Sequence, residues 1–158
     1  MNNRLPGNSP PKIAPRAAKR KTNSGKYTLK NPSKYLGNKS EITWRSSWEL
    51  RMMHFLDLNP NVINWASEEI KIHYHHPIKN KIATYIPDFF VTYKDKTGAQ
   101  LSEIIEIKPR KETLLNKKPS MYDKVAITIN EAKWAAARAY CSRAGLKFRV
   151  LTEDHIFK

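Results

Sequence analysis

Two carboxylates and a lysine have the residue types and spacing for metal-assisted chemistry. Asp88 and Glu106 lie nine residues on either side of Thr97, in the turn of a predicted β-hairpin. A symmetric hairpin places the two carboxylates opposite each other, with Cβ atoms about 5 Å apart, where like charges destabilise the sheet unless a cation lies between them. Lys108 follows Glu106 by two residues and projects from the same face of its strand. Such a set can hold Mg²⁺ on a phosphate and activate a water for in-line attack.

The same spacing also fits a surface without chemistry. Residues 106–108 could be an ordinary alternation on a solvated strand face, and Pro87-Asp88 could be a turn that leads into a strand. However, Ile104, Ile105 and Ile107 predict a central strand, where ionised groups are rarely kept without partners. This neighbourhood favours the metal site.

Hydrophobic periodicity predicts the elements that must position these residues. The helix begins near Ser46 and ends before Pro60, with Trp48, Met52, Phe55 and Leu56 as its inward stripe. The predicted elements are this helix within residues 45–60, a half-buried strand over 68–77, and a hairpin of strands 83–93 and 101–108 around a turn at 94–98.

The C-terminal third of the chain is predicted to contain a loop, a helix and a strand. Residues 110–129 have no clear period, and a connection of this length predicts a functional loop. Asn130 caps an Ala-rich helix over 131–144, which ends at Gly145 and is followed by a strand over 146–151. A helix that links two strands predicts parallel pairing beside the hairpin. The predicted fold class is therefore α/β, with a mixed central sheet flanked by helices.

Positive charge is concentrated at the N-terminus. The net charge is +15, and residues 1–40 contain no acid. Residues 1–26 are Pro-rich with few large apolar side chains, which predicts a disordered basic arm before a single domain over 27–158. Such an arm attracts polyanions, of which nucleic acid is the commonest, although a solubilising tail is the alternative. The bases that we expect to contact DNA include Arg16, Lys19, Arg20 and Lys21.

Other sites and settings are disfavoured. The lone Cys141 cannot pair within the chain, which favours a reducing compartment, and no apolar run reaches the roughly 18 residues of a membrane span. His73, His75 and His76 invite a zinc interpretation. Strand alternation puts only the first two on one face, and no cysteine or third ligand lies at a familiar spacing.

The chain resembles a known nuclease family. Pro87-Asp88 on one strand and Glu106-Ile107-Lys108 on the next resemble the PD-(D/E)xK motif. The resemblance covers about residues 26–155 and is to the head-completion nucleases of large tailed phages, which are similar to TnsA-type transposon endonucleases. The segments that carry it are KNPSKYLG, ITWRSSWE, LDLNPNVINWASEE, EIKPRKET and KWAAARAYCSRAGLKFRVLTED.

The resemblance implies a restriction-endonuclease-like fold and an activity. The implied activity is Mg²⁺-dependent hydrolysis of DNA phosphodiesters during virion assembly, before the head joins the tail. The implied partners are DNA and phage head or neck proteins, with no membrane, and the implied locations are the host cytoplasm during assembly and the virion. The alternatives are a TnsA-like or repair endonuclease, and a catalytically inactive DNA-binding structural neck protein.

The resemblance also assigns roles to individual residues. Asp88 and Glu106 would bind Mg²⁺, or Mn²⁺ in its place, together with the Ile107 carbonyl, and Lys108 would orient or activate the water. Glu49 would be a further metal-site carboxylate from the first helix, although Ser46-x-x-Glu49 also has the pattern of a helix capping box.

Three further residues match the family pattern with less definite roles. Arg45 and Lys133 are bases that we expect to contact DNA phosphates, although a plain surface charge is the alternative for Lys133. Glu68 would help by orienting a base.

Overall fold

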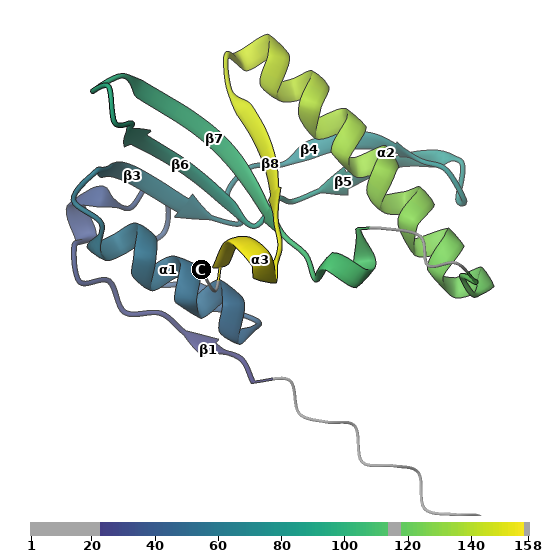
Figure 1. Ribbon diagram of the computed structural model, residues 1–158, viewed down its shortest axis with the longest axis horizontal. Helices are drawn as coiled ribbons and strands as arrows, with labels where there is room; N and C mark the ends of the chain where they lie inside the picture. The colour runs from purple at the N-terminus through teal and green to yellow at the C-terminus, as the bar shows by residue number, and fades with distance from the viewer. Residues whose placement is uncertain (1–22, 114–117, 157–158) are drawn as a thin grey trace, which may run out of the picture.

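A four-stranded mixed sheet lies between helices at the centre of the molecule, in a computed structural model that describes residues 23–113 and 118–156 (Figure 1). Its strands have the order β3-β6-β7-β8. In chain order the elements are β1 (Gly25–Lys26), η1 (Pro32–Lys34), β2 (Thr43–Trp44), α1 (Ser47–Leu58), β3 (Val62–Ser67), β4 (Ile72–His76), β5 (Lys81–Tyr85), β6 (Phe89–Lys94), β7 (Gln100–Ile107), η2 (Arg110–Glu112), α2 (Met121–Ala144), β8 (Lys147–Leu151) and α3 (Glu153–Ile156).

The hairpin of β6 and β7 has the register that the sequence predicts. Its pairs run from Lys94 with Gln100, next to the turn, to Phe89 with Ile105 at the far end. Gly98 has a φ of 82°, which closes the turn at a conformation that glycine adopts without strain. On the other side of β7, β8 pairs in parallel after the α2 crossover. The predicted mixed α/β sheet is thereby confirmed.

The predicted strand over 83–93 is wrong as a single element. It divides into β5, which pairs with β4 in a separate two-stranded sheet, and β6, which joins the central sheet. The break falls at Ile86-Pro87-Asp88 because Pro87 has no N–H to donate to a ladder. β3 was not predicted at all. It pairs antiparallel with β6 and carries Trp65, a fully buried side chain.

Helix α1 begins and ends where the sequence predicts, but its buried stripe is different. Ser46 is the N-cap, and the described helix ends at Leu58, before Pro60. Its buried apolar residues are Met52, Met53 and Leu56, whereas Phe55 is 55% exposed. Phe55 lies about 200° around the helix axis from Met53, on the opposite side.

Helix α2 is longer than predicted. It begins at Met121 with a capping box of Ser120 and Asp123, so Asn130 lies inside the helix. The predicted loop therefore consists of η2, a short connection that includes residues 114–117 outside the described ranges, and the first turns of α2. The β-branched run around Ile127 hides the helix at the sequence level, because such residues are weak helix formers. Gly145, with a φ of 71°, ends the helix as predicted.

The two faces of the central sheet contact different partners. Ile105 packs in a core with α1, whereas Ile104 packs in a second core with α2 and the β4–β5 hairpin. Because successive strand residues face opposite sides, Glu106 and Lys108 point to the same side as Ile104. The candidate site therefore lies on the α2 side of the sheet.

The N-terminal segment is anchored to α1. Buried Asp57 accepts hydrogen bonds from the Tyr27 hydroxyl at 2.8 Å and from the Lys30 and Asn31 N–H groups at 2.7 and 3.0 Å. β1 includes Gly25 and Lys26, the last two residues that the sequence assigns to the basic arm. None of the helices in the described ranges is long and apolar enough to span a bilayer.

Candidate active site

Asp88 and Glu106 face each other just beyond the last pair of the β6–β7 ladder. Phe89 pairs with Ile105, so Asp88 and Glu106 occupy the next opposing positions. The Ile107 N–H donates to Asp88 Oδ2 at 2.7 Å. This bond holds the Asp88 carboxylate against β7, although Asp88 itself precedes β6.

Lys108 lies beside Glu106. Its Nζ is 3.4 Å from Glu106 Oε1, and its N–H donates to the Leu151 carbonyl at 2.9 Å, which continues the pairing of β7 with β8. The Lys108 side chain is 28% exposed and that of Glu106 is 8% exposed. The Lys108 side chain is therefore partly exposed, next to a buried carboxylate.

Glu106 has a second partner that the sequence reasoning missed. The Tyr85 hydroxyl donates to Glu106 Oε2 at 2.7 Å from the end of β5. Burial raises the pKa of Tyr85 far above its usual range, and the charge of Glu106 adds to the effect. Tyr85 thus stays a protonated donor. The sequence gives only a weak signal for this contact, which is the position of Tyr85 three residues before Asp88. Tyr85 reaches Glu106 because the predicted strand breaks at Pro87.

The electrostatics of the pair favour a cation. The pKa of Asp88 is raised to about 8, first because burial disfavours its charged form and then because Glu106 faces it. The Ile107 N–H and the Lys108 ammonium lower the pKa but do not outweigh these causes. A divalent cation between the carboxylates would favour the ionised form instead.

The donor set fits Mg²⁺. This ion prefers oxygen ligands and is usually bound through one or two carboxylates, with waters and substrate phosphates in the remaining positions. Asp88 and Glu106 can supply the carboxylates. Among the described residues, no three His, Cys, Asp or Glu side chains converge closely enough to hold a metal ion. Waters, substrate phosphates and main-chain oxygens are the kinds of ligand that could fill the remaining positions.

Glu49 caps α1 in this structure. Its Oε2 accepts the Arg45 N–H at 2.8 Å, and its Oε1 accepts the Ser46 hydroxyl at 3.3 Å. In a regular capping box the Glu49 carboxylate would accept the Ser46 N–H, whereas here it accepts the Arg45 N–H. Glu49 is also among the groups whose charge raises the pKa of Asp88. Helix α1 thus brings a third carboxylate toward the pair without completing a three-ligand cluster.

Arg45 and Glu68 form a two-point ion pair near the site. Arg45 Nε and Nη2 lie 3.1 and 3.3 Å from Glu68 Oε1 and Oε2. The Glu68 N–H donates to the Asp88 carbonyl at 3.0 Å. Glu68 therefore links the Arg45 guanidinium to the main chain of Asp88, and its role of orienting a base stays a prediction.

Lys133 points inward. Its Nζ lies 5.7 Å from the ring centroid of Tyr85 and 6.0 Å from that of Tyr74, within cation–π range. The other bases that the sequence assigns to DNA contacts, Arg16, Lys19, Arg20 and Lys21, lie outside the described residues.

The histidine cluster is divided between two faces of β4. His73 and His75 are exposed, whereas His76 is buried. His76 Nδ1 accepts the Ile78 and Lys79 N–H groups, both at 3.2 Å. His76 therefore caps the β4–β5 turn.

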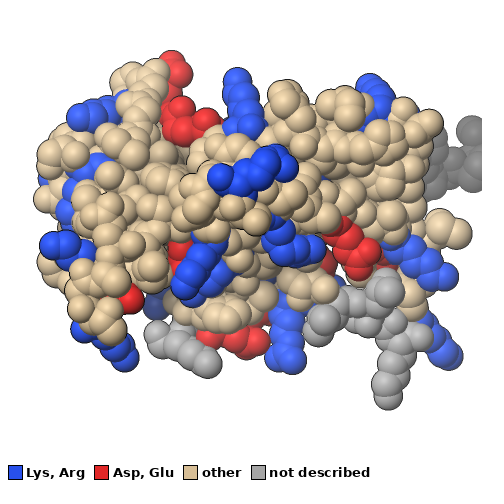
Figure 2. Space-filling view, turned by 90° about the horizontal axis from the view of Figure 1, so that it is seen from above, with Lys and Arg blue, Asp and Glu red and all other residues tan. Residues whose placement is uncertain are grey.

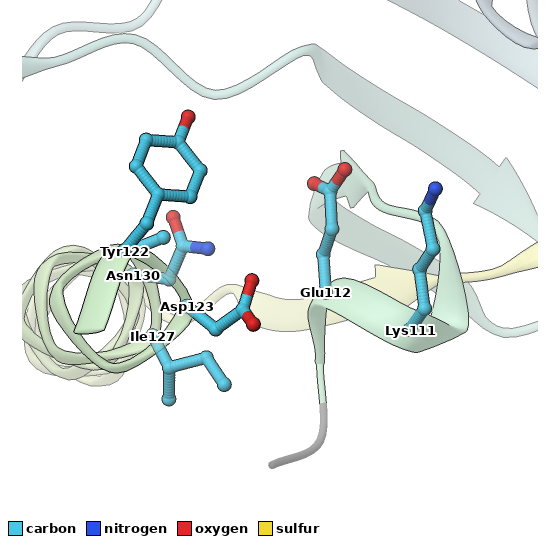
Figure 3. Close-up of a pocket in the computed structure, with 7 residues that line it drawn as sticks. Lys111, Glu112, Tyr122, Asp123, Ile127 and Asn130 are labelled. Atoms are coloured by element: carbon cyan, nitrogen blue, oxygen red, sulfur yellow. The ribbon is translucent and has the colours of Figure 1, made fainter. Parts of the chain in front are cut away.

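A hollow of about 350 Å³ lies between η2, which comes soon after Lys108 in the sequence, and the first turns of α2 (Figure 3). Lys111 and Glu112 line one side, and Tyr122, Asp123 and Asn130 line the other. The predicted loop over residues 110–129 thus supplies most of the lining of this cavity.

The mixed sheet flanked by helices fits the restriction-endonuclease-like fold class. The chain belongs to the family of TnsA-like endonuclease N-terminal domains, whose family model matches residues 59–153. It is 39% identical over 141 residues to the "Head completion nuclease" of Enterobacteria phage T4, a match that covers 83% of this chain and 91% of that protein. The predicted family is therefore confirmed. The range that the family model matches, residues 59–153, includes Asp88, Glu106 and Lys108, whereas Arg45 and Glu49 precede it.

Proposed function

We propose that this protein is a Mg²⁺-dependent nuclease that hydrolyses DNA phosphodiesters during phage head completion, before the head joins the tail. One observation carries the proposal: Asp88 and Glu106 face each other with Lys108 Nζ 3.4 Å from Glu106, and the pKa of Asp88 is raised to about 8. The family match and the name of the phage T4 relative support it.

Asp88 and Glu106 are the proposed metal ligands, together with the Ile107 carbonyl. An ion bound there would polarise the scissile phosphate and lower the pKa of the attacking water. The Lys108 ammonium, beside Glu106, orients that water and stabilises charge that develops on the phosphate. Glu49 adds negative charge from the start of α1.

DNA binding is assigned to bases around and ahead of the site. Arg45, held by Glu68, is one proposed phosphate contact, and Lys133 is the second. The arm bases Arg16, Lys19, Arg20 and Lys21 add sequence-independent attraction. Lys and Arg side chains also spread across the whole width of the face in Figure 2, with acidic groups interspersed among them. The excess of 29 Lys and Arg over 14 Asp and Glu in the sequence supports a polyanionic substrate.

The biological setting follows from the relative. A chain that spans 91% of a phage head completion nuclease supports the same stage of assembly, with phage head or neck proteins as partners. The host cytoplasm during assembly and then the virion are the corresponding locations. The family match by itself supports a second candidate, a TnsA-like endonuclease that acts outside virion assembly.

An inactive structural neck protein is less consistent with the site. Facing carboxylates destabilise a sheet, and such a pair has no structural benefit that apolar residues would not supply. The test is nicking of supercoiled plasmid with Mg²⁺ and then with EDTA. Wild-type protein should nick only with the metal, and Asp88→Asn and Glu106→Gln should not nick.

Glu103 provides a matched control for that assay. It is also a buried carboxylate on β7, paired with Arg149 at 2.9 Å, but it projects from the opposite face of the strand. Glu103→Gln should therefore retain metal-dependent nicking. Nicking that persists in Glu106→Gln, or that EDTA does not stop, would refute the proposed function.

A further inference from the structure

Tyr85 connects two parts of the fold at Glu106. It is the last residue of β5, in the two-stranded sheet, whereas Glu106 lies on β7 in the central sheet. The hydroxyl donates to Glu106 Oε2 at 2.7 Å, and the Tyr85 side chain is almost completely buried. The bond therefore forms inside the core and not at the surface of the site.

The two oxygens of Glu106 have different partners. Oε2 accepts the Tyr85 hydroxyl, whereas Oε1 lies 3.4 Å from the ammonium of the partly exposed Lys108. A carboxylate held at one oxygen cannot rotate freely, so the other oxygen keeps a fixed direction. Carboxylates that bind metals are commonly oriented by hydrogen bonds of this kind.

Helix α2 fixes the tyrosine in turn. The Lys133 ammonium lies 5.7 Å from the centroid of the Tyr85 ring. A cation over the face of an aromatic ring is attracted by its quadrupole, which restrains the ring. A chain of contacts therefore runs from α2 through Lys133 and Tyr85 to Glu106.

We propose that Tyr85 is a positioning residue for the metal ligand Glu106, and that Lys133 restrains the ring of Tyr85. The inference rests on the proposed function, because it requires Glu106 to bind the ion. It gives Lys133 a role inside the protein in addition to the phosphate contact that the sequence predicts. Tyr85 itself touches neither the substrate nor the ion.

The chain contains a matched pair elsewhere. The Tyr93 hydroxyl donates to Glu103 Oε1 at 2.9 Å, so a second tyrosine holds a second buried carboxylate of β7. Glu103 projects from the opposite face of β7 and is paired with Arg149. Tyr93→Phe removes the same hydroxyl from the same kind of bond, away from the candidate site.

The test is calorimetric titration of the full-length protein with Mg²⁺, without DNA. Tyr85→Phe should raise the dissociation constant for Mg²⁺ by about 10- to 100-fold, the usual effect of losing a partner that orients a ligand. Tyr93→Phe should bind Mg²⁺ like the wild type. In the plasmid assay, Tyr85→Phe should need correspondingly more Mg²⁺ for half-maximal nicking and regain the wild-type rate when Mg²⁺ is saturating.

Several outcomes would overturn the inference. Wild-type affinity in Tyr85→Phe, equal losses in Tyr85→Phe and Tyr93→Phe, or a rate that excess Mg²⁺ does not restore would each do so. If Glu106→Gln abolishes Mg²⁺ binding while Tyr85→Phe leaves it unchanged, only this inference fails. If the wild type shows no Mg²⁺ binding that depends on Glu106, the proposed function fails as well.

A second variant covers the case in which Tyr85→Phe does not fold. Tyr85→Phe combined with Glu106→Met leaves no buried carboxylate without its donor, and replacing both partners with apolar groups is often close to neutral. Restored folding in the double variant would show that the hydroxyl serves Glu106. A double variant that stays unfolded would make Tyr85 a residue of the core alone and would overturn the inference.

Discussion

The Ile107 N–H donates to Asp88 Oδ2 at 2.7 Å and so joins the end of β7 to the residue that precedes β6. The bond places the Asp88 carboxylate opposite Glu106, where regular strand pairing has already ended. The cost of this arrangement appears as the raised pKa of Asp88, to which burial contributes most and Glu106 next. Because the site is electrostatically unfavourable without a cation, we expect the stability of the metal-free protein to depend on the ionisation of Asp88.

The metal-free protein should lose stability as the pH rises from about 4 to about 8. The pKa of Asp88 is raised from 3.8 to about 8, so the folded state holds a proton that the unfolded chain releases. The contribution of the protonated Asp88 to the free energy of unfolding is therefore fully present below the pKa that Asp88 has in the unfolded chain. It is lost as the pH rises through the pKa of Asp88 in the folded protein. Urea unfolding in EDTA across this range should show the decline in the wild type and a flatter profile in Asp88→Asn. Identical profiles would contradict the assignment.

Lys108→Met should lose cleavage but keep Mg²⁺ binding. The ammonium lies 3.4 Å from Glu106 Oε1 and competes with an ion for that oxygen, so its removal leaves the affinity equal or higher. Removing one group that stabilises the transition state typically lowers kcat by about 10²- to 10³-fold. Single-turnover cleavage and Mg²⁺ titration together check this. The exposed Lys147→Met is the control, and wild-type turnover in Lys108→Met would make Lys108 a plain surface charge.

Asp57→Asn should destabilise the fold without affecting the site chemistry. Burial disfavours the charge of Asp57, but hydrogen bonds from Lys30, Tyr27 and Asn31 outweigh it and hold the pKa of Asp57 below its usual value. Its contribution is thus present above the unfolded pKa and is lost as the pH falls below about 4. We expect a loss of about 2 kcal/mol in the free energy of unfolding at neutral pH.

Exposed Asp154 is the control for Asp57. Its ion pair with Arg110 lies in solvent, so Asp154→Asn should change stability by less than about 1 kcal/mol. Nicking measured well below the unfolding temperature should be the same in both variants and in the wild type. Equal stability of Asp57→Asn and wild type would show that the N-terminal segment is not anchored through this carboxylate.

Deleting residues 1–22 should weaken DNA binding and reduce its dependence on salt. The deletion removes the bases Arg4, Lys12, Arg16, Lys19, Arg20 and Lys21 and keeps β1. If each base contacts a phosphate, the slope of log K against log salt falls by about five, at roughly 0.9 per contact. A full-length variant with these six bases changed to Gln should behave like the deletion. Unchanged binding would assign the arm to a protein partner.

The facing position of Asp88 and Glu106 could be predicted because a hairpin converts sequence distance into spatial distance. The hairpin is symmetric about Thr97, so residues equally far from it meet across the ladder. The cap at Ser46 and the end of α2 at Gly145 were equally local signals, and both were found. Local chemistry thus sufficed for most of the elements that carry the proposed site.

The role of Tyr85 could not be predicted, because it depends on contacts between different sheets. Within the run 83–93, Tyr85 and Asp88 look like residues of one strand, but the break at Pro87 ends β5 at Tyr85 and leaves Asp88 just before β6 of the other sheet. The first turns of α2 were missed because of a local signal, not because of distant contacts. Their β-branched residues disfavour a helix locally, and the capping box of Ser120 and Asp123 was not recognised.

The most direct test of the central claim is the anomalous scattering of Mn²⁺ in crystals of the wild-type protein. We predict a peak within coordination distance of the carboxylates of Asp88 and Glu106 and of the Ile107 carbonyl, and no such peak in crystals of Glu106→Gln. A peak at the exposed pair His73 and His75 alone, or a peak at the site that remains in Glu106→Gln, would contradict the account.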